Sequence, residues 1–237
     1  AEQYLTLKRE MVTTALSFEG IEAAVDDVIA IPPATRRRAV FAAHREGSEI
    51  VIGFHGRRSH HIVAVHDCAV ITPGLLALIP KLAPLAAIAA TPKDALSITA
   101  TETLSGFDVA LNGAPKAMSG DQRAKLVQLA SGLGLARLSI NGAVEMERTP
   151  PLLRVGEVNV MPAAGGFLQA SRESETAMLE LVQDAVGNAR RIVDLFAGSG
   201  TFSLPLAALA TVHAVEGEEA SVTALLLASR KASGIKP

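Results

Sequence analysis

The sequence predicts two architectures in succession: an α+β region of antiparallel strands with helices, and after it part of an α/β unit. Short strand-like runs separated by glycine turns indicate the first. The second is indicated by the apolar run Ile192–Phe196, which is followed by Gly198 and Gly200 and then by an apolar helix from Thr201 to Ala207. These observations predict a boundary between residues 1–162 and residues 163–237.

Strands in residues 1–162 are expected where apolar or β-branched residues recur between turn signals. Gly47 and Gly56 mark the turns between the first three strands, and Ser105–Gly106 marks the turn of a later hairpin. The expected strands are Arg37–His44, Glu49–His55, His60–His66, Leu96–Thr103, Phe107–Leu111, Ala136–Ile140, Val144–Glu147 and a short one within Val155–Pro162.

Helices are expected where apolar residues recur at helical spacing after a capping residue. Thr72 is a suitable N-cap, and Pro73 suits the first helical position after it. The expected helices are Glu2–Leu16, most of Thr72–Ala90, one from Ser119 or Asp121 to about Leu133, and one from about Glu173 to Val186.

The composition indicates a globular chain with little charge bias. Of 237 residues, 49% are hydrophobic and the net charge is −2, so any surface for nucleic acid must be a local patch. The single cysteine excludes an intramolecular disulfide and fits the reducing cytoplasm, where we expect the protein to work. No apolar run of 18 or more uncharged residues and no signal peptide are visible, so no membrane contact is expected.

The strand, glycine turn and helix at residues 192–207 together predict a cradle for a nucleotide-like ligand. The next strand, Val212–Val215, ends in Glu216, and 216 − 194 = 22 residues is close to the spacing at which an acidic residue meets ribose hydroxyls. Ser203 stands where a dinucleotide site needs a third glycine, and the turn has no Lys or Arg for a pyrophosphate. The alternative is an ordinary glycine-rich turn between a strand and a helix.

Two motifs carry a resemblance to a known family. The run Asp194–Phe202, D-L-F-A-G-S-G-T-F, resembles the first motif of class I S-adenosylmethionine (AdoMet) methyltransferases. Upstream of it, Phe167–Ser171 has the pattern F-x-Q-x-[NS] and is followed by one helix. The two motifs in this order resemble the bacterial RNA 5-methyluridine methyltransferases.

The resemblance implies that the second region is an incomplete α/β Rossmann-like AdoMet methyltransferase domain. The cofactor contacts that it implies are Gln169, Phe196, Thr201 and Glu216, together with Gly198 and Gly200, where a ligand can approach the backbone. Thr201 stands where the family often has Asn, and Gln169 has an alternative as a polar residue of a solvated loop.

The activity implied is methyl transfer from AdoMet to C5 of a uridine in RNA, with ribosomal RNA favoured over transfer RNA. The family's nucleophilic cysteine and its base lie further downstream, so we assign no catalytic residue to this chain. From Asp194 only 237 − 193 = 44 residues remain, against the seven or so strands of a complete domain. We therefore expect the chain to be a fragment that is inactive alone, cut from a protein that is monomeric.

Cys68 follows a predicted strand in a region that resembles the central domain of the same enzymes. In many members a cysteine at this point is the fourth ligand of a [4Fe–4S] cluster, whose other three cysteines lie upstream. With Cys68 as its single cysteine, this chain cannot complete the cluster, which is expected only in the full-length protein. The alternative is a small buried hydrophobic residue.

Basic residues cluster early in the chain and are the predicted RNA contacts: Arg36, Arg37, Arg38, Arg57 and Arg58. The alternative is a solvated hairpin surface that is partly paired with acidic neighbours. Metal binding by the nearby histidines is not expected, because the adjacent residues His60 and His61 would point to opposite faces of a strand.

Two other functions stay open from the sequence. The chain could belong to a class I methyltransferase that acts on a small molecule or a protein, or to an RNA-binding module that has kept a vestigial cofactor loop. Motifs upstream and downstream of these residues would separate the three hypotheses.

Overall fold

The protein, seen in a computed structural model that describes residues 2–91 and 95–232, divides into two compact units, residues 1–32 and 33–237. The first unit is α1 (Glu2–Phe18) with an irregular segment, to which Arg9 is joined by a hydrogen bond to the carbonyl oxygen of Val25 and an ion pair with Asp27. The predicted first helix is confirmed. None of the residues of α1, all of which are described, is buried.

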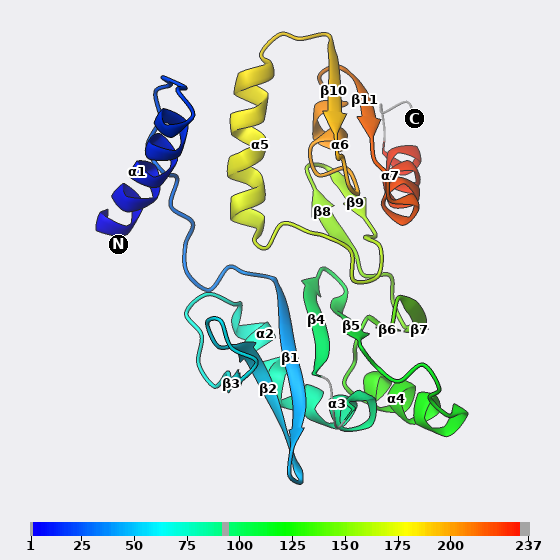
Figure 1. Cartoon of the computed structure of the whole chain (residues 1–237). Coiled ribbons are helices and arrows are strands. Elements are labelled where there is room, and N and C mark those ends of the chain that lie inside the picture. Colours follow the sequence, from blue (N-terminus) through cyan, green and yellow to red (C-terminus); the bar gives the residue numbers. More distant parts are fainter. Residues whose placement is uncertain (1, 92–94, 233–237) are drawn as a thin grey trace. The chain divides into compact units, whose positions relative to one another are not determined.

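The second unit is built on a seven-stranded sheet with the order β3-β2-β1-β4-β5-β6-β7 (Figure 1). The strands are β1 (Arg38–Glu46), β2 (Glu49–His55), β3 (Ile62–Ala64), β4 (Leu96–Thr103), β5 (Gly106–Asn112), β6 (Arg137–Ile140) and β7 (Ala143–Glu147). The strands were predicted at these places, although β3 is shorter than expected. The pair β5–β6 is parallel and the other pairs are antiparallel, because a helix crosses over between β5 and β6.

Three helices pack on one face of this sheet: α2 (Pro73–Leu78), α3 (Ala83–Ala89) and α4 (Gly120–Gly132). Side chains that alternate along the strands form the core beneath them, among them Phe41, Ile98 and Leu111, each 1% exposed or less. The opposite face of the same strands is polar, with Thr99, Thr101 and Asp108 directed away from the core.

The helix starts follow the predicted caps. Thr72 Oγ1 accepts from the amide of Leu75 at the start of α2, and Ser119 forms a capping box with Gln122 at the start of α4. The region predicted as mostly helix over Thr72–Ala90 is divided by a 3-10 turn, η1 (Ile79–Leu82). Pro80 and Pro84 explain the division, since proline has no amide hydrogen to donate within a helix.

The C-terminal elements form the predicted α/β arrangement. They are α5 (Arg172–Val186), β10 (Arg191–Leu195), α6 (Ser203–Leu206), β11 (Thr211–Val215) and α7 (Glu219–Lys231), with β10 and β11 paired in parallel. A mixed α+β region followed by a short parallel α/β unit confirms the predicted fold class.

A hairpin of β8 (Leu153–Val155) and β9 (Val158–Val160) packs against these later elements. Its valines share a small core with Leu204 and Ala228. Packing therefore groups the hairpin with the residues that follow it, and the boundary predicted at 162/163, which lies inside the second unit, stays a prediction.

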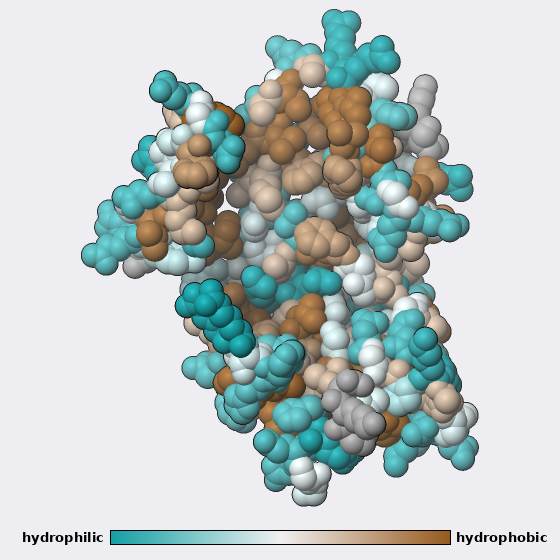
Figure 2. Space-filling view, in the orientation of Figure 1, coloured by the Kyte–Doolittle hydropathy of each residue, from teal (hydrophilic) through white to brown (hydrophobic). Residues whose placement is uncertain are grey.

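The β10–β11 pair leaves apolar side chains exposed. Val193 and Leu195 are each 62% exposed and Val215 is 42% exposed, and Figure 2 shows hydrophobic side chains gathered over this region. Parallel strands are ordinarily covered on both faces, so this exposed apolar surface is unusual for such a pair.

A buried ion pair joins the sheet to α5. Arg37, just before β1, donates from Nη2 to Glu175 Oε2 at 2.8 Å, and both side chains are 8% exposed. Burial raises the pKa of the Glu175 carboxyl, and the Arg37 guanidinium opposes that rise. A backbone hydrogen bond also joins these two parts of the chain, since the amide of Arg37 donates to the carbonyl oxygen of Ala170, just before α5, at 2.7 Å.

We predict that Glu175→Ala lowers the free energy of unfolding by about 3 kcal/mol, because the change leaves the Arg37 guanidinium buried without its partner. Arg36→Ala is the control: that side chain is exposed, and the expected change is within about 0.5 kcal/mol. Urea unfolding monitored by circular dichroism measures both. Equal midpoints for Glu175→Ala and the unsubstituted protein would show that the pair does not hold α5 to the sheet.

Candidate cofactor site

Two glycines, Gly198 and Gly200, shape the loop between β10 and α6. Phe196, Gly198 and Gly200 have φ angles of +59°, +57° and +97°. A Cβ at Gly200 would lie 2.5 Å from Leu225 Cδ1, so this glycine lets the loop pack on α7. A Cβ at Gly198 would have nothing within 4 Å, so the backbone on this side of the loop is open.

Glu216 joins the ends of the two parallel strands. It directly follows β11, and its Oε2 accepts from the amide of Gly198 in the β10 loop at 2.8 Å. Its Oε1 accepts from the amides of Gly217 and Glu218, each at 2.8 Å. The amide of Glu218, then that of Gly198, and to a lesser extent that of Gly217, hold the pKa of the Glu216 carboxyl below its ordinary value. These three amides therefore favour the ionised carboxylate and fix its direction.

A second polar contact fixes the same loop at its base. Ser203 Oγ at the start of α6 donates to Asp194 Oδ2 at 2.6 Å. The sequence alone marks Ser203 only as the residue in place of a third glycine, and it indicates no partner for Asp194. One sequence signal could have indicated this contact. Asp194 lies in a predicted strand, and Ser203 follows it nine positions later at the start of a helix.

The predicted cofactor residues differ in burial and in their contacts with one another. Gly198 and Glu216 are in direct contact, while Phe196 is 90% exposed on the same loop and Thr201 is partly buried beside it. Gln169 lies on the segment before α5, and among the described residues no hydrogen bond joins it to the β10 loop. The cofactor roles of these five residues and of Gly200 stay predictions.

The predicted RNA contacts separate into two groups. Arg36, Arg57 and Arg58 are exposed. Because β1 and β2 are antiparallel, the start of β1 and the β2–β3 turn lie at the same end of the strand pair, so these three share one end of the sheet.

Arg37 and Arg38 point inward instead. Arg37 is buried and paired with Glu175 inside the fold, and an RNA contact by Arg37 stays a prediction. Arg38 is half-buried, and its Nη2 donates to the carbonyl oxygen of Gly165 at 3.4 Å. A phosphate contact by Arg38 stays a prediction.

Cys68 packs, partly buried, against the core of the sheet. Within residues 2–91 and 95–232, no group of three or more His, Cys, Asp or Glu side chains is placed to hold a metal ion. A [4Fe–4S] cluster needs four ligands, and Cys68 is the single cysteine, so these residues by themselves do not fit the cluster.

No helix in the described part of the chain is long and apolar enough to cross a bilayer.

Comparison with known proteins found relatives over the full chain, while no family model matches. An RNA methyltransferase of Agrobacterium fabrum is 40% identical over 237 residues, which are 100% of this chain and 57% of that protein. The 23S rRNA (uracil(1939)-C(5))-methyltransferase RlmD of Dichelobacter nodosus is 31% identical over 202 residues, or 79% of this chain and 45% of that protein. The chain thus spans little more than half the length of such relatives.

A solved structure has the same fold. The tRNA (uracil-54, C5)-methyltransferase of Pyrococcus abyssi, in complex with S-adenosyl-L-homocysteine, matches with a TM-score of 0.73 at 16% identity over 97% of this chain and 59% of that one. Over essentially its whole length, the chain is 36–40% identical to six bacterial proteins named RNA methyltransferases.

Proposed function

We propose that this chain carries the AdoMet half-site and part of the RNA surface of an enzyme that methylates C5 of a uridine in RNA, with ribosomal RNA as the substrate. The observation that carries the proposal is the contact between Glu216 and Gly198 at the carboxyl ends of adjacent parallel strands. Ligands of open α/β sheets bind at this edge. The relatives named RNA methyltransferases support the reaction class.

The residues present fit AdoMet. The β10 loop contains no Lys or Arg, so it suits an amino acid and a ribose better than a pyrophosphate. Glu216 is an ionised acceptor, as a pair of ribose hydroxyls requires. The open space at Gly198 admits a ligand close to the backbone.

Glu216 is almost saturated before the ligand arrives. A carboxylate has about four acceptor positions, and three backbone amides already occupy it. One ribose hydroxyl can therefore be added directly, and a second must displace or share an amide, for which Gly198 in the open loop is best placed. When bound, AdoMet supplies an electrophilic methyl group. This chain's part is to orient it through Glu216, Gln169, Thr201 and the backbone of the loop.

The RNA surface is proposed at the sheet end that carries Arg36, Arg57 and Arg58. The same end adjoins the start of α5, because Arg36 forms a backbone bridge with Ser171. Guanidinium groups there would hold phosphates near the cofactor segment without reading the sequence. A uridine must leave its stack to be methylated.

The cofactor proposal predicts that Glu216→Ala weakens binding of S-adenosylhomocysteine tenfold or more, which is the order expected for a lost hydrogen bond to a charged group. Glu219→Ala, an exposed acidic residue in the first turn of α7, is the matched control and should bind as the unsubstituted chain does. Isothermal titration calorimetry measures both. Equal affinity for Glu216→Ala would remove Glu216 from the site.

The RNA proposal predicts that replacing Arg36, Arg57 and Arg58 by Ala lowers affinity for single-stranded RNA and flattens its salt dependence by roughly 0.7 per lost phosphate contact. Arg230→Ala, an exposed arginine on α7, serves as the control. Fluorescence anisotropy with a labelled RNA at several salt concentrations gives the slope. An unchanged slope would mean that these arginines are only solvated.

A further inference from the structure

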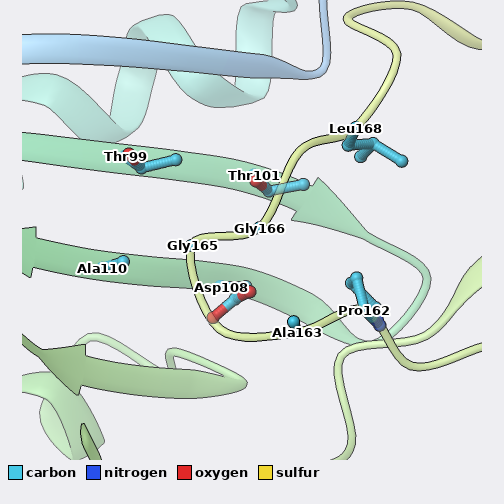
Figure 3. A pocket seen from close by; sticks show the side chains of 9 residues that line it. All are labelled: Thr99, Thr101, Asp108, Ala110, Pro162, Ala163, Gly165, Gly166 and Leu168. Atoms are coloured by element: carbon cyan, nitrogen blue, oxygen red, sulfur yellow. The ribbon is translucent and has the colours of Figure 1, made fainter. Parts of the chain in front are cut away.

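The polar face of the sheet is covered by one segment of chain. Residues 162–168 cross over β4 and β5, above Thr99, Thr101 and Asp108, as Figure 3 shows. The space left between them is about 10 Å³, which is room for about one water molecule. The segment is therefore packed on the sheet and leads directly into Gln169.

A buried carboxylate and a guanidinium hold the start of this segment. Arg137 on β6 donates from Nε and Nη2 to the two oxygens of Asp108 on β5, at 2.9 and 2.7 Å. Their side chains are 4% and 6% exposed. Arg137 Nη2 also donates to the carbonyl oxygen of Pro162 at 3.0 Å. The pair thus bonds the sheet to the first residue of the segment.

Arg38 on β1 lies in the same row across the sheet as Asp108, since Arg38 pairs with Thr101 and Thr101 pairs with Asp108. Its Nη2 donates to the carbonyl oxygen of Gly165, and its Nε is buried without a partner among the described atoms. Burial lowers the pKa of Arg38, and Asp108 opposes that shift. Arg137 thus bonds to the carbonyl oxygen of Pro162 and Arg38 to that of Gly165, so two guanidinium groups hold the segment at two places.

Gly165 allows the segment to pass close to β5. A Cβ at Gly165 would lie 3.3 Å from Ala110 Cβ, and the φ of Gly165 is +68°. Just beyond Gln169, the carbonyl of Ala170 accepts from Arg37 and Ser171 bridges to Arg36. Gln169 thus lies between two held points: residues 162–165, which bond to side chains of the sheet, and residues 170–171, which bond to Arg36 and Arg37 just before β1.

We propose that Asp108, Arg137 and Arg38 are positioning residues for the cofactor site, which hold the carbonyls of Pro162 and Gly165 and thereby place Gln169 where it meets AdoMet. This inference rests on the proposed function for the role of Gln169. Stability alone explains the buried pair poorly, because a buried ion pair often contributes no more than apolar residues of the same volume. A role in fixing the path of residues 162–168 explains these buried charges better.

The first test measures the segment without any ligand. Amide hydrogen exchange of residues 163–170 should become at least tenfold faster in Asp108→Asn, which keeps the shape and removes the charge, while the amides of β4 and β5 keep their protection. Glu145→Gln is the matched control, a carboxylate of the same sheet that pairs with Arg123 away from the segment. Arg38→Gln, a milder change at a half-buried position, gives the same readout if Asp108→Asn does not fold.

The second test is a double-mutant cycle on affinity for S-adenosylhomocysteine, measured by calorimetry. Gln169→Ala should weaken binding in the unsubstituted chain. It should cause no further loss in the Asp108→Asn background, because Asp108 is proposed to affect binding through the position of Gln169. Additive effects, or unchanged exchange in the segment, would overturn the inference. If the unsubstituted chain fails to bind the ligand, the proposed function fails, whereas the exchange experiment still decides whether the segment is clamped.

Discussion

The candidate site depends on one carboxylate that joins two strand ends. Glu216 leaves β11 and accepts from the amide of Gly198 in the loop after β10, while the next two amides of its own chain hold its other oxygen. Three amide donors keep the carboxylate ionised and fix its direction. The loop, the parallel strand pair and the start of α7 thus share a single charge-assisted hydrogen-bonding centre.

The central sheet supports this centre from a distance. Its inner face is an ordinary apolar core, but its outer face carries charges that bond to the chain leading into the site. Arg37 bonds to Glu175 in the first turns of α5, and Arg137 bonds to Asp108 and Pro162 before it. Buried charges of this kind are costly unless every one is paired, so the segment between them has few alternative paths. The placement of Gln169 is a property of the sheet as much as of its own loop.

Local signals predicted much of the fold and part of the site. The strand, glycine turn and helix around Gly198 and Gly200, and the acid at Glu216, follow from residue spacing, and the caps at Thr72 and Ser119 follow from side-chain chemistry. These features depend on residues that are near one another in the sequence, so local sequence patterns are enough to predict them.

The features that local sequence patterns do not indicate depend on contacts between distant residues. Three consecutive arginines look equivalent, yet Arg36 is exposed while Arg37 meets Glu175, 138 residues away. The pairing of Asp108 with Arg137 requires the parallel register of β5 and β6. The packing of the β8–β9 hairpin on α7 likewise follows from tertiary contacts that no local pattern signals.

The central claim is that the two strand ends joined by Glu216 bind the adenosyl part of AdoMet. A titration of the ¹⁵N-labelled chain with S-adenosylhomocysteine, followed by amide chemical shifts, tests it most directly. The account predicts that the largest shifts occur at the three amides that donate to Glu216, those of Gly198, Gly217 and Glu218, and that the strands of the seven-stranded sheet are little affected. Shifts confined to that sheet, or none at millimolar ligand, would contradict it.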